Sequence, residues 1–210
     1  SRLAIDAIRQ VLVHDDGKLL IDIDDVKLEK KVGGSVEETE LIKGLVLDKS
    51  RVHASMPVKV HDAKIALIDS ALEIKNTEVD AKISITDPAK MQEFLDMEER
   101  MLKKMVDTVV ATGANVVCCQ KGVDDLAQHF FSKAGVYVLR RLKRSDMQRM
   151  VKATGGKIVT DLKDLSSADL GKAGMVEEVR VGDEEMTYVR ECDNPRSVTI
   201  LIRGSTEHVI

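Results

Sequence analysis

The sequence predicts an α/β fold in which mixed sheets carry flanking helices and one long helix protrudes from the body. In the second half of the chain, short apolar runs of strand length alternate with helical patterns, which is typical of β-α-β organisation. Gly113, Gly135 and Gly155 stand where those helices should end. Between residues 87 and 113 a helical pattern of about 25 residues predicts a rod of roughly 37 Å, longer than a compact body requires.

The first half of the chain is predicted to consist of strands after one short helix. Apolar residues at helical spacing over residues 3–12 predict the helix. Alternation then predicts strands that close at Gly33-Gly34. Further segments of strand length follow on either side of a polar loop, and one more precedes the long helix. The strands are expected over residues 19–26, 27–32, 41–47, 63–72 and 77–85.

After residue 113 the alternation of strands and helices predicts a parallel sheet. A hairpin that turns near Gly182-Asp183 and a break at Asp193-Asn194-Pro195 follow. The predicted elements are strands over residues 115–120, 136–140 and 157–160, helices over 123–133 and 145–154, the hairpin over 177–188 and a last strand over 197–202.

Composition narrows the class of protein. Of the 210 residues 32% are charged and 43% hydrophobic, which is typical of a globular protein. No apolar run approaches the roughly 18 residues of a membrane span. A net charge of −4, with two Tyr, three Phe and no Trp, speaks against nucleic-acid binding. Three cysteines and an N-terminus unlike a secretory signal favour a reducing compartment. We therefore expect a cytoplasmic protein with no membrane and no nucleic-acid partner.

The local sequence marks where the long helix begins. Thr86-Asp87-Pro88 places a capping residue before a proline at the first helical position. One apolar stripe runs along the helix, and a second joins it in the N-terminal half only, so the apolar surface is widest at the outer end. The first stripe comprises Met91, Leu95, Leu102, Met105 and Val109, and the second Phe94, Met97 and Met101.

This methionine-rich surface has two interpretations. It could pack on the core of its own domain, as apolar helix faces commonly do. The length of the helix favours the alternative, because a body with so few aromatic residues offers the outer turns little to pack against. Methionine side chains also adapt to different partners. We therefore expect part of the surface over residues 91–101 to contact another molecule.

No motif indicates an enzyme. Three Gly-Lys pairs lack the spacing and the following Ser or Thr of a phosphate-binding loop. Cys118 and Cys119 on one strand would point to opposite faces and could not easily share a metal. His53 and His61 are a weak metal hint that solvated histidines explain better. A basic cluster is interpreted as a solvated face or a contact with another subunit or a substrate, and comprises Arg140, Arg141, Lys143, Arg144 and Arg149. We predict no catalytic residue and no metal ligand.

Several segments carry a resemblance to a known family. They are Val32-Gly33-Gly34-Ser35, Thr39-Glu40-Leu41-Ile42-Lys43-Gly44, Lys64-Ile65-Ala66-Leu67-Ile68-Asp69, Gly113-Ala114-Asn115-Val116-Val117 with Gln120-Lys121-Gly122, Arg140-Arg141, Lys143-Arg144-Ser145-Asp146, Ala153-Thr154-Gly155-Gly156 and Ile200-Leu201-Ile202-Arg203-Gly204. Together they resemble the group II chaperonins, the archaeal thermosome and its eukaryotic cytosolic relatives. The similarity covers essentially the whole chain and is nearest to the archaeal type.

This resemblance implies a chaperonin apical-domain-like fold of mixed sheets with flanking helices and a long protruding helix, plus a small α+β fragment of the intermediate domain. The apical domain would cover residues 34–194, with a helical protrusion over about 82–113, and the intermediate domain residues 1–33 and 195–210. Hinges would lie at Gly33, Gly34, Asn194 and Pro195. The equatorial domain, which binds ATP and Mg in the intact subunit, would be outside this chain. No cofactor and no ATPase activity are therefore implied for the chain itself.

The resemblance also implies two roles. The protrusion would form a built-in lid over an ATP-dependent folding chamber, and its lid and intersubunit residues would be Met91, Phe94, Leu95, Met97 and Met101. The helix over residues 123–133 would form one wall of a groove for unfolded polypeptide, with contacts expected at Leu126, Phe130, Phe131 and Met105. Ala127 and one of the two Phe residues could equally face the sheet, and core packing is the alternative for each of these side chains. The partners would be unfolded polypeptides and sister subunits of a double ring. The alternative is a structural interaction domain that makes only intersubunit contacts.

Overall fold

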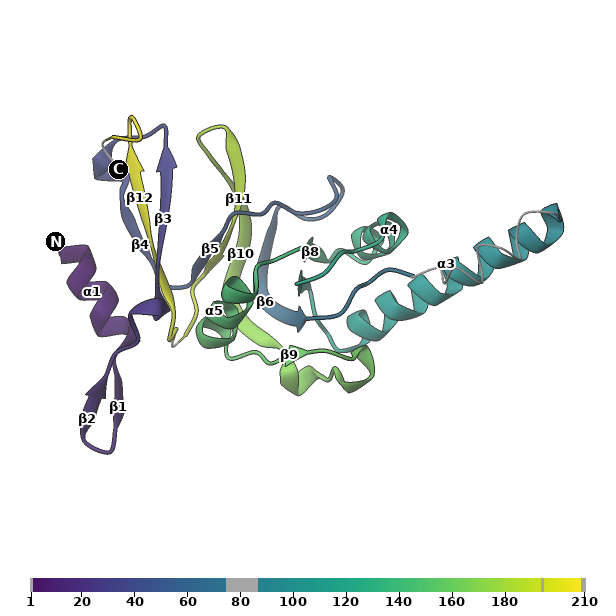
Figure 1. Cartoon of the computed structure of the whole chain (residues 1–210), viewed down its shortest axis with the longest axis horizontal. Coiled ribbons are helices and arrows are strands. Elements are labelled where there is room, and N and C mark those ends of the chain that lie inside the picture. Colours follow the sequence, from purple (N-terminus) through teal and green to yellow (C-terminus); the bar gives the residue numbers. More distant parts are fainter. Residues whose placement is uncertain (1, 75–86, 194, 209–210) are drawn as a thin grey trace.

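A mixed sheet forms the centre of the molecule. The computed structural model describes residues 2–74, 87–193 and 195–208 (Figure 1). Within these residues seven strands run in the order β5-β11-β10-β6-β7-β8, with β9 paired to β6. Their bounds are β5 Leu45–Leu47, β6 Lys59–Ile68, β7 Val116–Cys119, β8 Tyr137–Leu139, β9 Ile158–Val159, β10 Gly171–Val181 and β11 Glu184–Arg190. The predicted α/β class with mixed sheets is confirmed.

Strand β6 joins a parallel to an antiparallel part of this sheet. β7 and β9 pair with its C-terminal half and run parallel to it, and β8 continues this part beyond β7. β10 pairs antiparallel with residues 59–65 of β6, and β11 and β5 follow beyond it. β10 and β9 therefore pair with successive parts of β6, β10 along residues 59–65 and β9 at Leu67 and Ile68.

Helices cover both faces of the parallel part. α3 (Pro88–Ala111) and α4 (Asp125–Lys133) pack on one face, and α5 (Arg144–Thr154) packs on the other. Each face therefore has its own apolar core. Alternation along β7 places Cys118 in the core beneath α5 and Cys119 in the core beneath α3 and α4, so the predicted opposite orientation of these cysteines is confirmed.

A smaller, three-stranded sheet is described beside the first. β12 (Val198–Gly204) lies at its centre, parallel to β3 (Val26–Val32) and antiparallel to β4 (Glu40–Ile42). Helix α1 (Arg2–Val11) buries Ala7 and Val11 against Val198 and Ile200. A hairpin of β1 (Val13–Asp15) and β2 (Lys18–Leu20) extends from the end of α1 (Figure 1).

The chain crosses from the small sheet to the large one at Gly44. Residues 41–47 were expected to form a single strand, but β4 and β5 belong to different sheets, so that expectation is wrong. Gly44 has φ +145°, and a Cβ there would collide with the carbonyl oxygen of Val189. Only glycine permits both the backbone angle and the close approach of the two chain segments.

Ion pairs also join the two sheets, through α5. The Lys152 ammonium pairs with the buried carboxylate of Asp25, which raises the pKa of Lys152. Lys27 of β3 pairs with Asp146 at 3.0 Å and donates to the Val46 carbonyl at 2.9 Å. The Ser197 hydroxyl donates to the backbone carbonyl of Asp25 at 3.0 Å. We refer to these contacts as the α5 clasp.

Two further expectations differ from the structure. The strand expected over residues 19–26 ends with β2 at Leu20, and a 3-10 turn, η1 (Ile23–Asp25), follows. The Asp22 carboxylate accepts a hydrogen bond from the Asp24 N–H at 3.0 Å, which favours the turn over the strand. The hairpin expected over residues 177–188 is longer, because β10 begins at Gly171. The strand expected over residues 77–85 lies outside the described residues.

All three thiols are buried and none forms a disulfide. Burial raises the pKa of Cys118 to about 12, and the pKa values of Cys119 and Cys192 to about 11. A buried thiol is both hard to ionise and hard to reach, so it is a poor nucleophile in the folded chain. These residues therefore act as small apolar side chains of the two cores.

The buried thiols predict a loss of stability in alkali. Their pKa values are higher in the folded than in the unfolded chain, where they fall near 9, so their stabilising contribution is complete below pH 9 and is lost as the pH rises towards 11. Each thiol contributes about 1.4 kcal/mol per pH unit in this window. Urea unfolding at pH 8 to 11 measures the effect. The triple variant with Cys118→Ala, Cys119→Ala and Cys192→Ala should show a smaller fall, and an equal fall would contradict the assignment.

Candidate functional site

Helix α3 has an anchored inner half and an exposed outer half. Its buried residues, Leu102, Val106 and Val109, all lie in the inner half. In the outer half Met91 is 40%, Leu95 49% and Met97 48% exposed, and Phe94 is half-buried. The helix begins as predicted, since the Asp87 carboxylate accepts a hydrogen bond from the Ala89 N–H at 3.0 Å and Pro88 follows. The outer half therefore presents an apolar surface that the core of this chain does not cover.

Two different surfaces border the inner half of α3. Figure 1 shows α4 along one flank and the segment after β9 along the other. That segment contains the 3-10 turns η3 (Leu162–Asp164) and η4 (Ser167–Asp169). Leu102, Val106 and Val109 share one apolar core with residues of α4 and of this segment, so the three elements form one continuous layer on the sheet.

Helix α4 separates its side chains between the core and the surface. The Asp124 carboxylate accepts a hydrogen bond from the Leu126 N–H at 2.9 Å and fixes the start of the helix. Leu126 and Phe130 are half-buried at the edge of the core. The His129 ring is exposed, with its centroid 6.1 Å from that of Phe130 and 6.3 Å from that of His53.

The structure does not support a surface role for Phe131. Its side chain is fully buried in the core beneath α3 and α4. Residues one turn apart share a face of a helix, so Phe131 lies with Ala127 on the side of α4 that faces the sheet. We correct the expectation accordingly: Phe131 is a core residue, whereas Leu126 and Phe130 reach the surface.

Met105 lies on the other flank of α3. It lines a hollow of about 420 Å³ with Met101 and Leu162, and Lys104 and Lys163 stand at the same hollow. The sequence grouped Met105 with the residues of α4 and did not single out Leu162 or the two lysines. Leu162 and Lys163 follow the strand β9, and this position could have identified them, because loops at the carboxyl ends of parallel strands meet at one edge of a sheet. Lys104 lies within α3 and carries no such signal.

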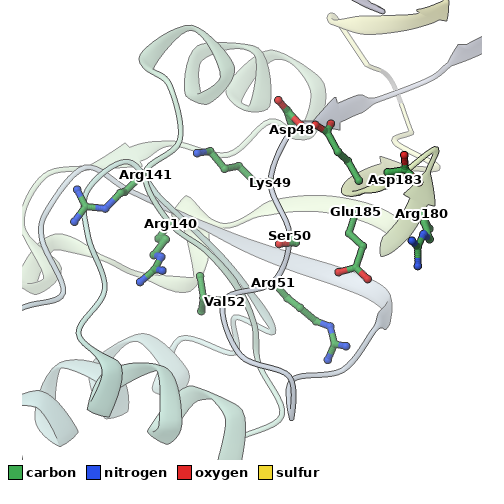
Figure 2. A pocket seen from close by; sticks show the side chains of 11 residues that line it. Asp48, Lys49, Ser50, Arg51, Val52, Arg140, Arg141, Arg180, Asp183 and Glu185 are labelled. Atoms are coloured by element: carbon green, nitrogen blue, oxygen red, sulfur yellow. The ribbon is translucent and has the colours of Figure 1, made fainter. Parts of the chain in front are cut away.

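A larger and more polar hollow of about 770 Å³ lies where β8 ends. Figure 2 shows Lys49, Arg140 and Arg141 on one side of it, whereas on the other side Arg180 stands among the acidic Asp183 and Glu185. The basic cluster expected from the sequence is thus divided, because Arg149 lies at the α5 clasp, where it donates to the Asp24 carbonyl at 3.2 Å.

The expected hinge residues lie at the ends of the small sheet. Gly33 has φ +101° and donates its N–H to the Gly204 carbonyl at 3.0 Å. The Arg203 guanidinium donates to the Gly33 carbonyl at 3.1 Å, and Gly34 follows directly. Pro195 is buried next to the start of β12, and Asn194 lies outside the described residues. Whether the chain bends at these positions stays a prediction.

Within residues 2–74, 87–193 and 195–208 no three His, Cys, Asp or Glu side chains come together in a way that could hold a metal ion. His53 lies beside His129, and His61 is exposed on β6. No helix of the described part of the chain is long and apolar enough to cross a membrane.

Comparison with known proteins identifies the family. The model of the TCP-1/cpn60 chaperonin family matches residues 1–210. The chain belongs to this chaperonin family. It is 56% identical over its whole length to thermosome subunit beta of Archaeoglobus fulgidus and 55% identical to a thermosome subunit of Pyrococcus horikoshii. In both comparisons it spans 38% of the length of the relative.

A solved structure supports the same relationship. The chaperonin chain superposes on an open-state monomer of a group II chaperonin from Methanococcoides burtonii with a TM-score of 0.80 and 40% sequence identity. The match covers 100% of this chain and 46% of that one. The resemblance to group II chaperonins of the archaeal thermosome type, inferred from the sequence, is confirmed.

The division of α4 in this chaperonin chain predicts unequal effects of two neighbouring substitutions. Phe131→Ala should lower the free energy of unfolding by about 3 to 5 kcal/mol, because it leaves a cavity in the core. Phe130→Ala should cost roughly 1 to 2 kcal/mol, because the side chain is already partly hydrated. Urea unfolding of both variants measures the difference. Equal losses would mean that the two rings are equally buried.

Proposed function

We propose that this chaperonin chain binds unfolded polypeptide and closes an ATP-dependent folding chamber as a built-in lid. The observation that carries the proposal is the exposed apolar outer half of α3, which continues a helix firmly anchored in the core. Family membership supports a protein-folding role for the subunit to which such a chain belongs. The two parts of the proposal use neighbouring but different surfaces.

Client binding is assigned to the surface formed by α4 and the adjacent side of α3. Leu126 and Phe130 present apolar atoms there and are held by the core behind them. An unfolded chain exposes apolar side chains that gain free energy when such a surface removes them from water, at about 25 cal/mol per Å². Hydrophobic attraction does not require a fixed geometry between the groups in contact, so this surface can bind clients of varied sequence. Phe131 contributes only by fixing the orientation of α4.

Lid closure is assigned to the outer half of α3. The outer half of α3, which carries Met91, Leu95 and Met97, extends far from the two sheets (Figure 1). Contacts between the protrusions of sister subunits in a double ring would bury this surface, and methionine side chains can repack in each new contact. Phe94 lies within the same stretch of the helix, and Met101 continues it towards the body.

ATP chemistry is assigned to other parts of the intact subunit. The chain contains no GxxxxGK[ST] loop, and its buried thiols are poorly nucleophilic. ATP and Mg would therefore act on this chain only by moving it as a body, and we propose no enzymatic activity for the chain itself. We also propose that the chaperonin acts in the cytoplasm, where its thiols would stay reduced.

The pairing of β4 suggests how this body divides into domains. β4 belongs to the three-stranded sheet with β3 and β12, so a boundary at residue 34 would cut that sheet. We propose that the intermediate-domain part extends to Ile42 and that the apical part begins with β5. Gly44 then lies at the crossing between them, and the α5 clasp spans the same junction.

The second candidate function is a structural interaction domain that makes only intersubunit contacts. The exposed methionines of α3 fit this role as well, because a ring interface would bury them. A reporter crosslinker attached through Met97→Cys separates the two functions, since the native thiols are buried. Capture of an unfolded client supports client binding, and capture of sister chains alone supports the structural role.

Client binding predicts that the chain suppresses aggregation of a chemically denatured model protein, measured by light scattering. Phe130→Glu should weaken suppression several-fold, because a charge in the apolar surface opposes burial. Leu19→Glu, on the β1-β2 hairpin, is the matched control, since Leu19 is 61% exposed and remote from α4. Absence of suppression at any chain concentration would contradict client binding.

The lid assignment predicts a separable defect in the intact subunit. Deletion of residues 84–100 should leave ATP hydrolysis unchanged, because the outer half of α3 contributes nothing to the core. An encapsulated client should, however, become accessible to protease during the ATP cycle. Continued protection of the client after the deletion would refute the lid assignment.

A further inference from the structure

The hollow beside Met105 lies at a special position in the sheet. From β6 the chain passes through α3 to β7 and through α4 to β8, always on one face. It then passes through α5, on the other face, to β9, which pairs with the opposite side of β6. The carboxyl ends of β6 and β9 are therefore a switch point of the parallel strands, the place where such sheets leave a crevice for ligands. Ser70 and Ala71 after β6 and Asp161 after β9 line the hollow.

The floor of this hollow is apolar and firmly supported. Met105 and Leu162 pack against the core beneath α3 and α4. Met101 closes the outer side and is 44% exposed. At about 420 Å³ the hollow is within the size range of binding pockets for small molecules, so it accepts a large apolar side chain together with part of a backbone.

The rim of the hollow is positively charged, although the chain as a whole carries −4. Lys104 and Lys163 both stand at it. Neither forms an ion pair with any residue that the structure describes. The Asp161 carboxylate accepts a hydrogen bond from the Lys163 N–H at 3.0 Å and thus caps η3. The two ammonium groups outnumber this one carboxylate, so the rim carries a net positive charge that favours a partner of opposite sign.

We propose that this hollow is a second client subsite, which holds an apolar side chain of an extended polypeptide and selects segments with a carboxylate beside that side chain. The proposal rests on the client binding proposed above and adds a sequence preference to it. The subsite lies on the flank of α3 opposite to α4, so a single extended client can cross α3 and occupy both surfaces. Charge supplies the selectivity, and the apolar floor supplies an anchor point.

Peptide binding to the whole chain tests the proposal. Two labelled unstructured peptides share one central Phe-Leu pair, flanked by Asp in one and by Lys in the other, and their Kd values are measured by fluorescence anisotropy. The Asp-flanked peptide should bind roughly fivefold to tenfold tighter, since two exposed ion pairs favour it. Raising the salt concentration should reduce the preference.

Charge reversal tests which residues cause the preference. The double variant Lys104→Glu and Lys163→Glu should invert it, whereas Lys18→Glu with Lys30→Glu changes the net charge equally at exposed, remote positions and should preserve it. Leu162→Cys labelled with a bulky maleimide fills the hollow and should weaken the Asp-flanked peptide alone, because the native thiols are buried.

The outcomes separate the two proposals. One outcome is that both peptides bind, that Phe130→Glu weakens both, and that Lys104→Glu with Lys163→Glu changes neither Kd. The second subsite is then refuted, and client binding at α4 stands. If neither peptide binds, both proposals fail. If the chain instead self-associates in sedimentation and the lysine reversal dissolves the dimers, the occupant is a second copy of the chain, which also refutes a client subsite.

Discussion

Strand β6 is the constraint on which the rest of the molecule depends. It is hydrogen-bonded to β7 on one side and, along successive parts of its other side, to β10 and β9. Residues 65–68 of this strand are fully buried, with Ile65 and Leu67 in one core and Ala66 and Ile68 in the other. β7, β9 and β10 pair with this strand directly, β8 and β11 through one neighbour, and β5 through β10 and β11. α3 begins at its outer end and runs inward, so its carboxyl-terminal half packs on the face of the sheet to which Ala66 and Ile68 point.

The arrangement of charged groups supports the same organisation. Both sheets have apolar interiors, and polar contacts join them at α5, where Lys152 pairs with Asp25 and Lys27 with Asp146, and also between β3 and β11, where Lys31 pairs with Glu184. Pairing of partly buried groups fixes one relative orientation more sharply than apolar contact alone, because a displaced ion loses its partner without regaining water. Apolar contact holds α3 and α4 to the sheet, and it tolerates small displacements of side chains such as Met105. The molecule thus has a specified junction and an adaptable binding layer.

Local sequence patterns were enough to predict α3, α4, α5 and the strands of the parallel part. Their signals are short-range: the cap at Asp87, the glycines after the helices and the apolar run before Cys119. The division of residues 41–47 between two sheets could not be predicted, because an apolar run looks the same whichever sheet it joins. It depends on Gly44 meeting Val189, a residue remote in sequence.

Prediction of the candidate site from the sequence was limited in the same way. Periodicity marked the α3 surface, since the spacing of its methionines is visible within one helix. It could not decide between Phe130 and Phe131, because adjacent residues on a helix differ by about 100° and the facing direction is set by the sheet beneath. The hollow at Leu162 was beyond sequence reasoning for a different reason. Its walls come from three segments that are remote from one another in the sequence, residues 70–71, four residues of α3, and residues 161–163.

The uneven anchoring of α3 has a consequence for its length. Helix formation is limited by its first turn, and the inner half supplies that turn permanently through Leu102, Val106 and Val109. The outer turns are therefore added or removed one at a time, each changing the reach of the rod by about 5.4 Å. Because no core residue is exposed when they melt, this equilibrium is independent of global unfolding. The tip can adjust its length to whatever it meets while the sheet beneath stays intact.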